Sequence, residues 1–155
     1  MNIGRIASNA VLRYPGAKWR IADFILRHMP QHHSYLEPFF GSGAVLFRKQ
    51  PSAIETVNDI NGDIVNLFRV VQEQADVLAD YVAGIPYARQ VYEVSLHGNP
   101  TSSDVKRAAR FLILAWQSYG SRADGKNCGW KKDVVGREAA YAVRCWNLLP
   151  GWIVA

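Results

Sequence analysis

A glycine-rich turn between two short strand patterns constrains the fold of this chain more than any other feature. The turn reads Glu-Pro-Phe-Phe-Gly-Ser-Gly over residues 37–43; a strand pattern over 34–38 leads into it, and a second follows over 54–58. Glycine adopts positive φ readily and lets a bound molecule approach the main chain, because it carries no Cβ. Strand, glycine turn, helix and strand in this order predict a parallel βαβ unit that binds a nucleotide at the turn.

The rest of the chain predicts mainly helix, and no further clear strand can be identified. Apolar residues recur at helical spacing over 19–29, 44–49, 64–83, 105–119 and 136–149, and residues 87–96 are ambiguous with a preference for helix. In the first of these helices, Ile21, Phe24 and Ile25 predict the apolar face. Breaks are expected at 84–86 and at 150–151, with a polar loop over 120–132. The apolar residues 152–155 suggest an element that is cut off or that docks on something absent.

Two acidic residues flank the glycine turn at positions suited to a nucleoside. Glu37 precedes it, and Asp59 ends the second strand, 16 residues beyond Gly43. A carboxylate in that place can accept hydrogen bonds from both ribose hydroxyls. The alternative is structural: Glu37 capping a neighbouring helix, and Asp59 capping the helix that follows it.

Other nucleotide motifs are absent. The dinucleotide pattern G-x-G-x-x-G fails because Leu46 stands where the third glycine is needed, which argues against NAD or FAD. The segment 16–19 lacks the hydroxyl that follows the lysine in a phosphate-binding loop, which argues against ATP or GTP. Just before it, the turn Tyr-Pro-Gly-Ala-Lys over 14–18 can hold Lys18 toward a bound carboxylate and offers the flat ring of Tyr14. Taken alone, it would be an ordinary turn with an exposed lysine.

Together, the segments Tyr-Pro-Gly-Ala-Lys, Glu-Pro-Phe-Phe-Gly-Ser-Gly and Asn-Asp-Ile-Asn-Gly-Asp resemble the Dam-type (D12 class, alpha-group) DNA adenine-N6 methyltransferases. The resemblance is specific over residues 13–68. It implies an α/β fold of the Rossmann-like methyltransferase type, with S-adenosylmethionine as cofactor and a helical DNA-recognition insert. By this resemblance Tyr14 and Lys18 contact the methionine end, Asp59 holds the ribose and Ile60 packs on the adenine. The pocket lining is Glu37, Pro38, Phe39, Gly41 and Gly43.

The D-P-P-[YFW] motif that carries catalysis in this family is absent from the 155 residues. We therefore expect no catalytic residue in this chain, which is interpreted as an N-terminal portion of the enzyme with an incomplete sheet. The expected division is a cofactor-binding part over 1–75, a helical target-recognition region over 76–150 and the start of a truncated continuation over 151–155. The alternatives are a non-catalytic, degenerate DNA-binding module and a nucleotide-binding domain of another class.

Charge is unevenly distributed. Residues 1–100 hold nine basic and nine acidic residues, whereas residues 101–155 hold nine basic and four acidic ones, which accounts for the whole net charge of +5. A basic surface attracts nucleic acid, so double-stranded DNA is the expected partner. The predicted contacts are Arg110, Tyr119, Arg122, Lys126, Lys131 and Lys132, with Trp130 as a further possibility. The alternative is a buried Tyr119 among solvated basic residues.

Other classes of protein are disfavoured. No apolar run is long enough for a membrane helix and no signal peptide is recognisable, so a cytoplasmic location is expected. The histidines at 28, 32 and 33 lack the carboxylate or cysteine that would complete a metal site, and none is expected. An incomplete sheet exposes an unpaired edge strand and apolar surface, which favours self-association or docking with a missing C-terminal part.

Overall fold

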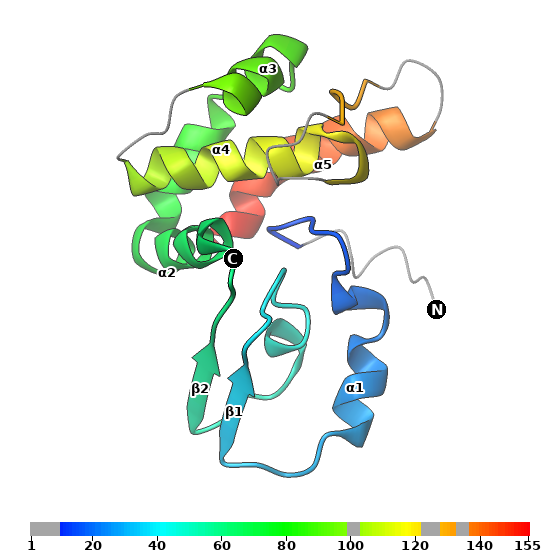
Figure 1. Cartoon of the computed structure of the whole chain (residues 1–155), viewed down its shortest axis with the longest axis vertical. Helices are drawn as coiled ribbons and strands as arrows, with labels where there is room; N and C mark the ends of the chain where they lie inside the picture. Colours follow the sequence, from blue (N-terminus) through cyan, green and yellow to red (C-terminus); the bar gives the residue numbers. More distant parts are fainter. Residues whose placement is uncertain (1–9, 99–102, 122–127, 133–136) are drawn as a thin grey trace.

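The computed structural model describes residues 10–98, 103–121, 128–132 and 137–155, with the backbone alone over 137–142 (Figure 1). Its helices are α1 (Ala22–His28), α2 (Gly62–Ala83), α3 (Arg89–His97), α4 (Asp104–Gln117) and α5 (Arg137–Ile153). Its strands are β1 (Ser34–Glu37) and β2 (Ile54–Val57), and short 3-10 turns cover Lys18–Arg20, Leu46–Arg48 and Tyr119–Ser121. None of these helices is both long and apolar enough to cross a membrane.

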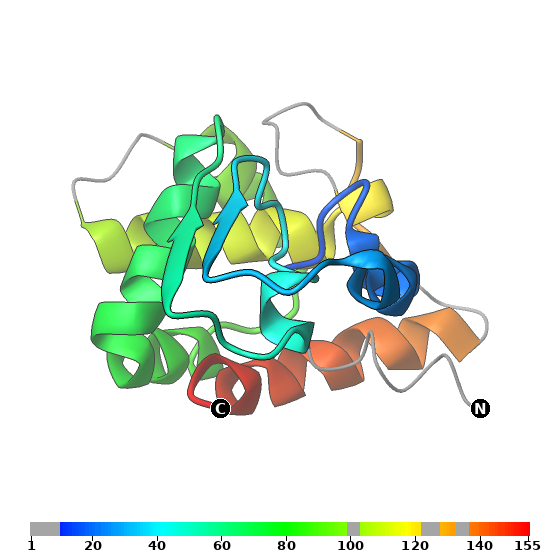
Figure 2. The same ribbon diagram turned by 90° about the horizontal axis from the view of Figure 1, so that it is seen from below.

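The strands form a parallel pair, as the sequence predicts. Ser34 is paired with Ile54 and Glu37 with Val57. Both strands point toward the helices, so their carboxyl ends lie together at the end of the sheet that is nearest to the helices (Figure 1). The sheet and the main group of helices follow one another along the long axis of the molecule (Figure 1). Viewed from below, along that axis, the strands lie in front of α4 (Figure 2). This mixture of helix with a small parallel sheet is consistent with an α/β methyltransferase domain.

The hydrophobic core lies in the helical layer, around α4. This helix buries Leu112, Ala115 and Trp116 almost completely and packs against α2, α3 and α5. The indole Nε1 of Trp116 donates a hydrogen bond of 2.9 Å to the carbonyl oxygen of Val11, which ties the segment before α1 to α4. Burying side chains of this size contributes about 1.5–3 kcal/mol each, so α4 anchors the fold.

Helix α2 begins at a side-chain cap and runs across the division expected between residues 75 and 76. The side chain of Asn61 accepts a hydrogen bond of 2.9 Å from the amide of Asp63, which satisfies one of the free N–H groups at the start of the helix. Gln74 has non-helical backbone angles (φ −143°, ψ 39°) inside α2. The helix therefore crosses the expected boundary at residues 75 and 76 with a kink but without a linker.

The helix expected over residues 44–49 is wrong in extent, because the structure has a 3-10 turn over Leu46–Arg48 alone. Pro51 disfavours helical backbone in the residue before it, which leaves few residues between the glycine turn and the proline. A helix that short is not stable by itself. The turn packs instead through Phe47, whose ring centroid lies 6.0 Å from that of Phe40 and 5.8 Å from that of Phe68.

The break expected at residues 150–151 is also wrong. Helix α5 continues through Pro150 to Ile153. Leu149 is fully buried and Ile153 is 3% exposed, one helical turn apart on the same face, and Trp152 lies against Trp116 with ring centroids 5.8 Å apart. This packing offsets the backbone hydrogen bond that proline cannot make. The apolar residues near 152 thus pack on the chain's own core.

The helix predicted over residues 19–29 is present, but its apolar side is largely exposed. The helix begins at Ala22 rather than at residue 19, and among its side chains Ala22 is buried. Phe24 is 58% exposed, and so is much of the neighbouring sheet, with Leu36 at 63% and Ile54 at 53%. Helical spacing identified the side of the helix that is apolar, but within the described residues no layer covers it.

Candidate functional site

The segment after β1 first continues the hydrogen-bonding pattern of the sheet. It then reverses direction at two glycines. The amide of Asn58 donates to the carbonyl of Glu37 (2.9 Å), and the amide of Phe40 donates to the carbonyl of Asn58 (3.0 Å). Gly41 and Gly43 then have φ values of +55° and +70°. A Cβ on Gly43 would lie 2.4 Å from the Phe47 ring and 2.6 Å from the Phe40 ring. Both backbone angle and space therefore require glycine at position 43.

Asp59 ties this turn to the start of α2. Its Oδ2 accepts a hydrogen bond of 2.8 Å from the amide of Gly41, and its Oδ1 accepts one of 2.9 Å from the amide of Asn61. Asn61, not Asp59, caps the helix. Asp59 is half-buried, and each carboxylate oxygen keeps acceptor capacity beyond these bonds. Its position at the carboxyl end of β2 is the one from which a ribose would be bound.

Lys18 and Glu37 form a pair beside the turn. The Lys18 ammonium donates to the carbonyl of Phe39 (3.2 Å) and lies 3.5 Å from Glu37 Oε1. The phenol of Tyr35 donates to Glu37 Oε2 (2.8 Å), so this buried carboxylate is bound from both sides and caps no helix. Burial and the hydrogen bond to Glu37 raise the pKa of Tyr35 well above its usual range. Glu37 thus holds Lys18 at the turn, and Tyr35 holds Glu37.

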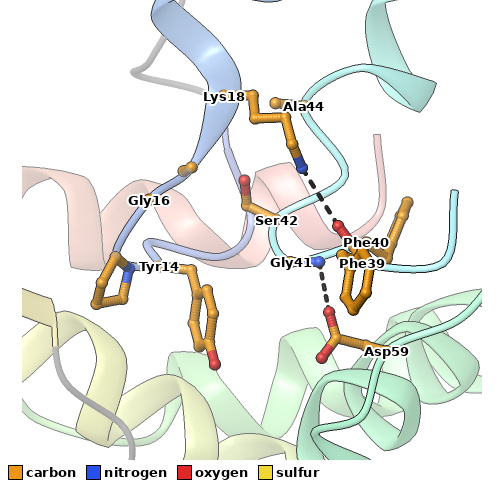
Figure 3. A pocket seen from close by; sticks show the side chains of 11 residues that line it. Tyr14, Gly16, Lys18, Phe39, Phe40, Gly41, Ser42, Ala44 and Asp59 are labelled. Carbon is orange, nitrogen blue, oxygen red and sulfur yellow. Dashed lines mark hydrogen bonds between the residues drawn. The ribbon is translucent and has the colours of Figure 1, made fainter.

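A hollow of about 140 Å³ opens between the segment 14–18 and the glycine turn (Figure 3). Lys18 lies at one end and Asp59 at the other, with the ring of Tyr14 along the side (Figure 3). Its lining consists of Tyr14, Pro15, Gly16, Ala17, Lys18, Phe39, Phe40, Gly41, Ser42, Ala44 and Asp59. The volume is below the roughly 300–1,000 Å³ of ordinary small-molecule pockets, so the hollow is large enough for only part of a ligand of that size.

The structure brings most of the predicted cofactor residues together. Tyr14, Lys18, Phe39, Gly41 and Asp59 line the hollow. The others predicted for this site do not, namely Glu37, Pro38, Gly43 and Ile60. Glu37 acts through Lys18 and Gly43 shapes the turn, whereas the Ile60 side chain is 93% exposed.

Sequence reasoning missed Ser42 and Tyr35. Ser42 occupies the unspecified position between the two glycines of the motif and lines the hollow. Tyr35 stands two residues before Glu37 on the same strand, so alternation along β1 places the two side chains on one face. That spacing was a usable signal for Tyr35. For Ser42 the sequence offers none beyond its place in the turn.

The region predicted to contact DNA centres on a short backbone ladder after α4. Ser118 bridges to Trp130, and the amide of Tyr119 donates to the carbonyl of Gly129 (3.2 Å). The Tyr119 side chain is 48% exposed, and its hydroxyl donates to the carbonyl of Lys132 (3.0 Å). Tyr119 is therefore not buried, and it lies beside the exposed Lys132 and the half-buried Lys131.

The other predicted DNA contacts are placed differently. The Arg110 guanidinium donates to the carbonyl of Ser95 (2.5 Å) near the end of α3, so it braces α3 against α4. Trp130 lies against Tyr87 with ring centroids 5.8 Å apart, and its Nε1 donates to Gln117 (3.4 Å), which turns it toward the core. Arg122 and Lys126 lie outside the described residues.

Two of the three histidines considered for a metal site lie within hydrogen-bond distance of backbone carbonyls. His28 Nδ1 lies 2.8 Å from the carbonyl of Phe24, and His32 Nδ1 lies 2.8 Å from that of Pro30. Over the residues that the structure describes, no group of histidine, cysteine and acidic side chains is arranged to hold a metal ion. Cys128 and Cys145 are both free thiols.

Comparison with known proteins is consistent with this site. A sequence model of the D12 class N6 adenine-specific DNA methyltransferases matches residues 14–119, which include every residue that lines the hollow. The DNA adenine methylase of Salmonella typhi is 30% identical over 117 residues, which cover 72% of this chain and 42% of that protein. The DNA adenine methylase of Serratia marcescens is 29% identical, covering 72% and 43%. The DNA N-6-adenine-methyltransferase of Escherichia phage P1 is 28% identical, covering 68% and 14%.

The chain thus spans less than half the length of these curated relatives. The matched region nevertheless holds all three sequence segments on which the resemblance rested, and the structure gathers those segments around one hollow. The chain therefore belongs to the D12 class N6 adenine-specific DNA methyltransferase family.

Proposed function

We propose that this chain binds S-adenosylmethionine in the hollow between residues 14–18 and the glycine turn, as the N-terminal portion of a Rossmann-like methyltransferase domain. The observation that carries the proposal is the pairing of an ammonium group at one end of the hollow with a carboxylate at the other. Lys18 suits the carboxylate of the amino-acid end, and Asp59 suits the ribose hydroxyls. The glycine turn between them lets the ligand approach the backbone.

The donor set fits this cofactor better than a phosphate-bearing one. Lys18 is already paired with Glu37, so the net charge at that end of the hollow is close to zero. A di- or triphosphate would bring several negative charges to a site with Asp59 at its other end, whereas the cofactor brings one carboxylate. When bound, S-adenosylmethionine supplies the methyl group for transfer.

We further propose that the reaction served is methylation of adenine N6 in DNA, which is the activity in the names of the relatives. The chain's own contribution is to bind cofactor and DNA, because the 155 residues hold no D-P-P-[YFW] motif. In the family that motif accepts hydrogen bonds from the target amino group and stacks the flipped base. This chain alone is expected to be inactive.

Double-stranded DNA is proposed to lie across Tyr119, Lys131 and Lys132. The support is the exposed aromatic ring beside two lysines after the end of α4. These residues lie within the segment 101–155, which carries the whole net positive charge. Lysines contact phosphates, and an exposed aromatic side chain can fill the space that a flipped base leaves. Arg110, Arg122 and Lys126 stay predicted contacts.

The open sheet is proposed to associate with a further polypeptide, either a C-terminal part or another copy of the chain. Parallel sheets are normally covered on both faces, yet every residue of β2 is exposed. The exposed side chains of Leu36, Ile54 and Val57 would be removed from water by such an association.

Isothermal titration of the chain with S-adenosylmethionine and S-adenosylhomocysteine tests the proposed cofactor site. Saturable binding is expected, with losses of about tenfold or more in Asp59→Ala and Lys18→Ala, because each removes a charged partner. Asp76→Ala and Lys106→Ala change exposed side chains of the same kinds on α2 and α4 and should bind normally. Unaltered binding in both site variants would rule out the hollow as the site.

A non-catalytic DNA-binding module is the second candidate function, favoured by the absent catalytic motif. It predicts DNA binding that weakens with salt and does not respond to S-adenosylhomocysteine. The methyltransferase proposal predicts that S-adenosylhomocysteine binds the chain whether or not DNA is present.

A further inference from the structure

Ser42 carries a buried hydroxyl for which the described residues provide no partner. Its side chain lies between the two positive-φ glycines of the turn, the residue is 3% exposed, and its Oγ makes no hydrogen bond. Buried hydroxyl groups are normally paired, because leaving one unpaired forfeits its hydrogen bonds to water. Among the unpaired buried polar atoms of the described residues, Ser42 Oγ is the one whose residue lines the hollow.

The turn that carries Ser42 is fixed on both sides, so its backbone cannot easily move to find a partner. The amide of Gly41 is bound to Asp59 (2.8 Å), and the amide of Gly43 donates to the carbonyl of Phe40 (3.0 Å). The rings of Phe40 and Phe47 close the space beside Gly43. Ser42 lines the hollow, so the hollow is the side from which a ligand can approach its hydroxyl.

The hydroxyl lies on the same side of the hollow as the Lys18 ammonium. In Figure 3 the Ser42 oxygen points between the segment at Gly16 and the Lys18 side chain. An ammonium has three N–H donors; that of Lys18 donates to the carbonyl of Phe39 and lies 3.5 Å from Glu37 Oε1. The Lys18 ammonium and the Ser42 hydroxyl are thus two groups with donor capacity at one end of the hollow. A carboxylate, which accepts at two oxygens, suits such a pair.

We propose that Ser42 is a positioning residue that donates a hydrogen bond to the carboxylate at the amino-acid end of the cofactor. This inference rests on the proposed function and adds a specific contact to it. Lys18 supplies an ammonium donor at that end, and Ser42 adds a hydroxyl donor beside it. The chain should therefore distinguish ligands that carry the amino-acid end from nucleosides that lack it.

Two ligands separate this contact from the rest of the site. S-adenosylhomocysteine has the amino-acid end, whereas 5′-methylthioadenosine keeps the adenosine and the thioether without it. In isothermal titrations, Ser42→Ala and Ser42→Cys should weaken S-adenosylhomocysteine by about tenfold to a hundredfold, the value of a hydrogen bond to a charged group. Binding of 5′-methylthioadenosine should change by less than about twofold. Ser34→Ala, at the exposed start of β1, should leave both affinities unchanged.

Thermal unfolding of the ligand-free variants gives a second, independent readout. Ser42→Ala should not lower the melting temperature, because it removes a hydroxyl that has no partner to lose. A lower melting temperature together with equal weakening of both ligands would mean that Ser42 has a structural role, and would overturn the proposal. Unchanged S-adenosylhomocysteine binding in Ser42→Ala would also overturn it while leaving the proposed function intact. If the wild-type chain binds neither ligand, the proposed function fails and this inference fails with it.

Discussion

The phenol of Tyr35 donates a 2.8 Å hydrogen bond to Glu37, whose other carboxylate oxygen faces Lys18. Tyr35 does not line the hollow, so it affects a ligand only through these two residues. It also supports the fold, because the Lys49 ammonium lies 4.8 Å from its ring centre. A substitution that keeps the ring and removes the hydroxyl separates the two roles.

Tyr35→Phe is therefore expected to weaken S-adenosylhomocysteine binding about threefold to tenfold, because Glu37 loses one of the groups that orient it toward Lys18. The free energy of unfolding should fall by about 0.5–1.5 kcal/mol. Titration calorimetry and urea unfolding measure the two effects. Normal binding would show that Glu37 keeps its orientation without the phenol.

Alkaline unfolding tests the environment of the same phenol. Because the folded chain raises the pKa of Tyr35, it retains that proton after the unfolded chain has lost it. The stabilisation is thus complete below about pH 10, the pKa of an unperturbed tyrosine, and is lost as the pH rises above it. The free energy of unfolding is to be measured from about pH 8 to about pH 11, a range that brackets the pKa of an unperturbed tyrosine. Above about pH 10 it should fall more steeply for wild type than for Tyr35→Phe. Parallel curves would contradict this.

Gly43→Ala is expected to destabilise the chain by about 2–4 kcal/mol and to abolish ligand binding. The new Cβ would collide with the ring of Phe40, which is buried and cannot move aside freely, at a backbone angle that alanine disfavours. Gly151→Ala is the matched control, because a Cβ there meets nothing within 4 Å. In α5 that exchange should stabilise by about 0.5–1 kcal/mol. Urea unfolding of both variants checks the pair, and equal effects would contradict the strained turn.

Ile153→Ala tests whether the last turn of α5 belongs to the core. The side chain is 3% exposed, so its truncation should cost about 2–5 kcal/mol of stability, whereas Val154→Ala, at 49% exposure, should cost less than about 1 kcal/mol. Chemical unfolding distinguishes them. Similar small losses in both would mean that α5 ends before Pro150 in solution.

Removing Lys131 and Lys132 together should weaken DNA binding and reduce its dependence on salt. Each phosphate that a lysine no longer neutralises lowers the slope of log affinity against log salt by about 0.9, so the double alanine variant should have a slope smaller by nearly two. Arg20→Ala with Arg27→Ala removes the same charge from the exposed surface near α1. Fluorescence anisotropy with a short duplex measures both, and an equal change of slope in the two would show that overall charge, not this surface, binds DNA.

The sequence predicted the elements whose signals are local. The strands near Leu36 and Ile54 and the long helix after Asn61 follow from short patterns that tertiary contacts did not override. The cofactor residues followed from a resemblance, and five of the nine line the hollow.

What sequence could not supply depends on packing between distant segments. Pro150 is tolerated because Leu149 and Ile153 are buried, and the burial of either depends on α2 and α4. Phe24 lies on an apolar side that no described layer covers. Arg110, assigned to DNA by its charge, is directed to carbonyl groups at the end of α3. In each case the outcome depends on which segment packs against the residue, and the local sequence does not specify that segment.

The hydrogen bond from Trp116 to Val11 joins the two proposed ligand regions mechanically. Val11 lies three residues before Tyr14 on the segment that forms one wall of the hollow, and Trp116 lies three residues before Tyr119. If the proposed regions bind DNA and cofactor, a displacement of the end of α4 by DNA would reach the segment that lines the hollow through this one buried indole. Because linked binding equilibria are reciprocal, the factor by which bound DNA changed the affinity for the cofactor would equal the factor by which bound cofactor changed the affinity for DNA.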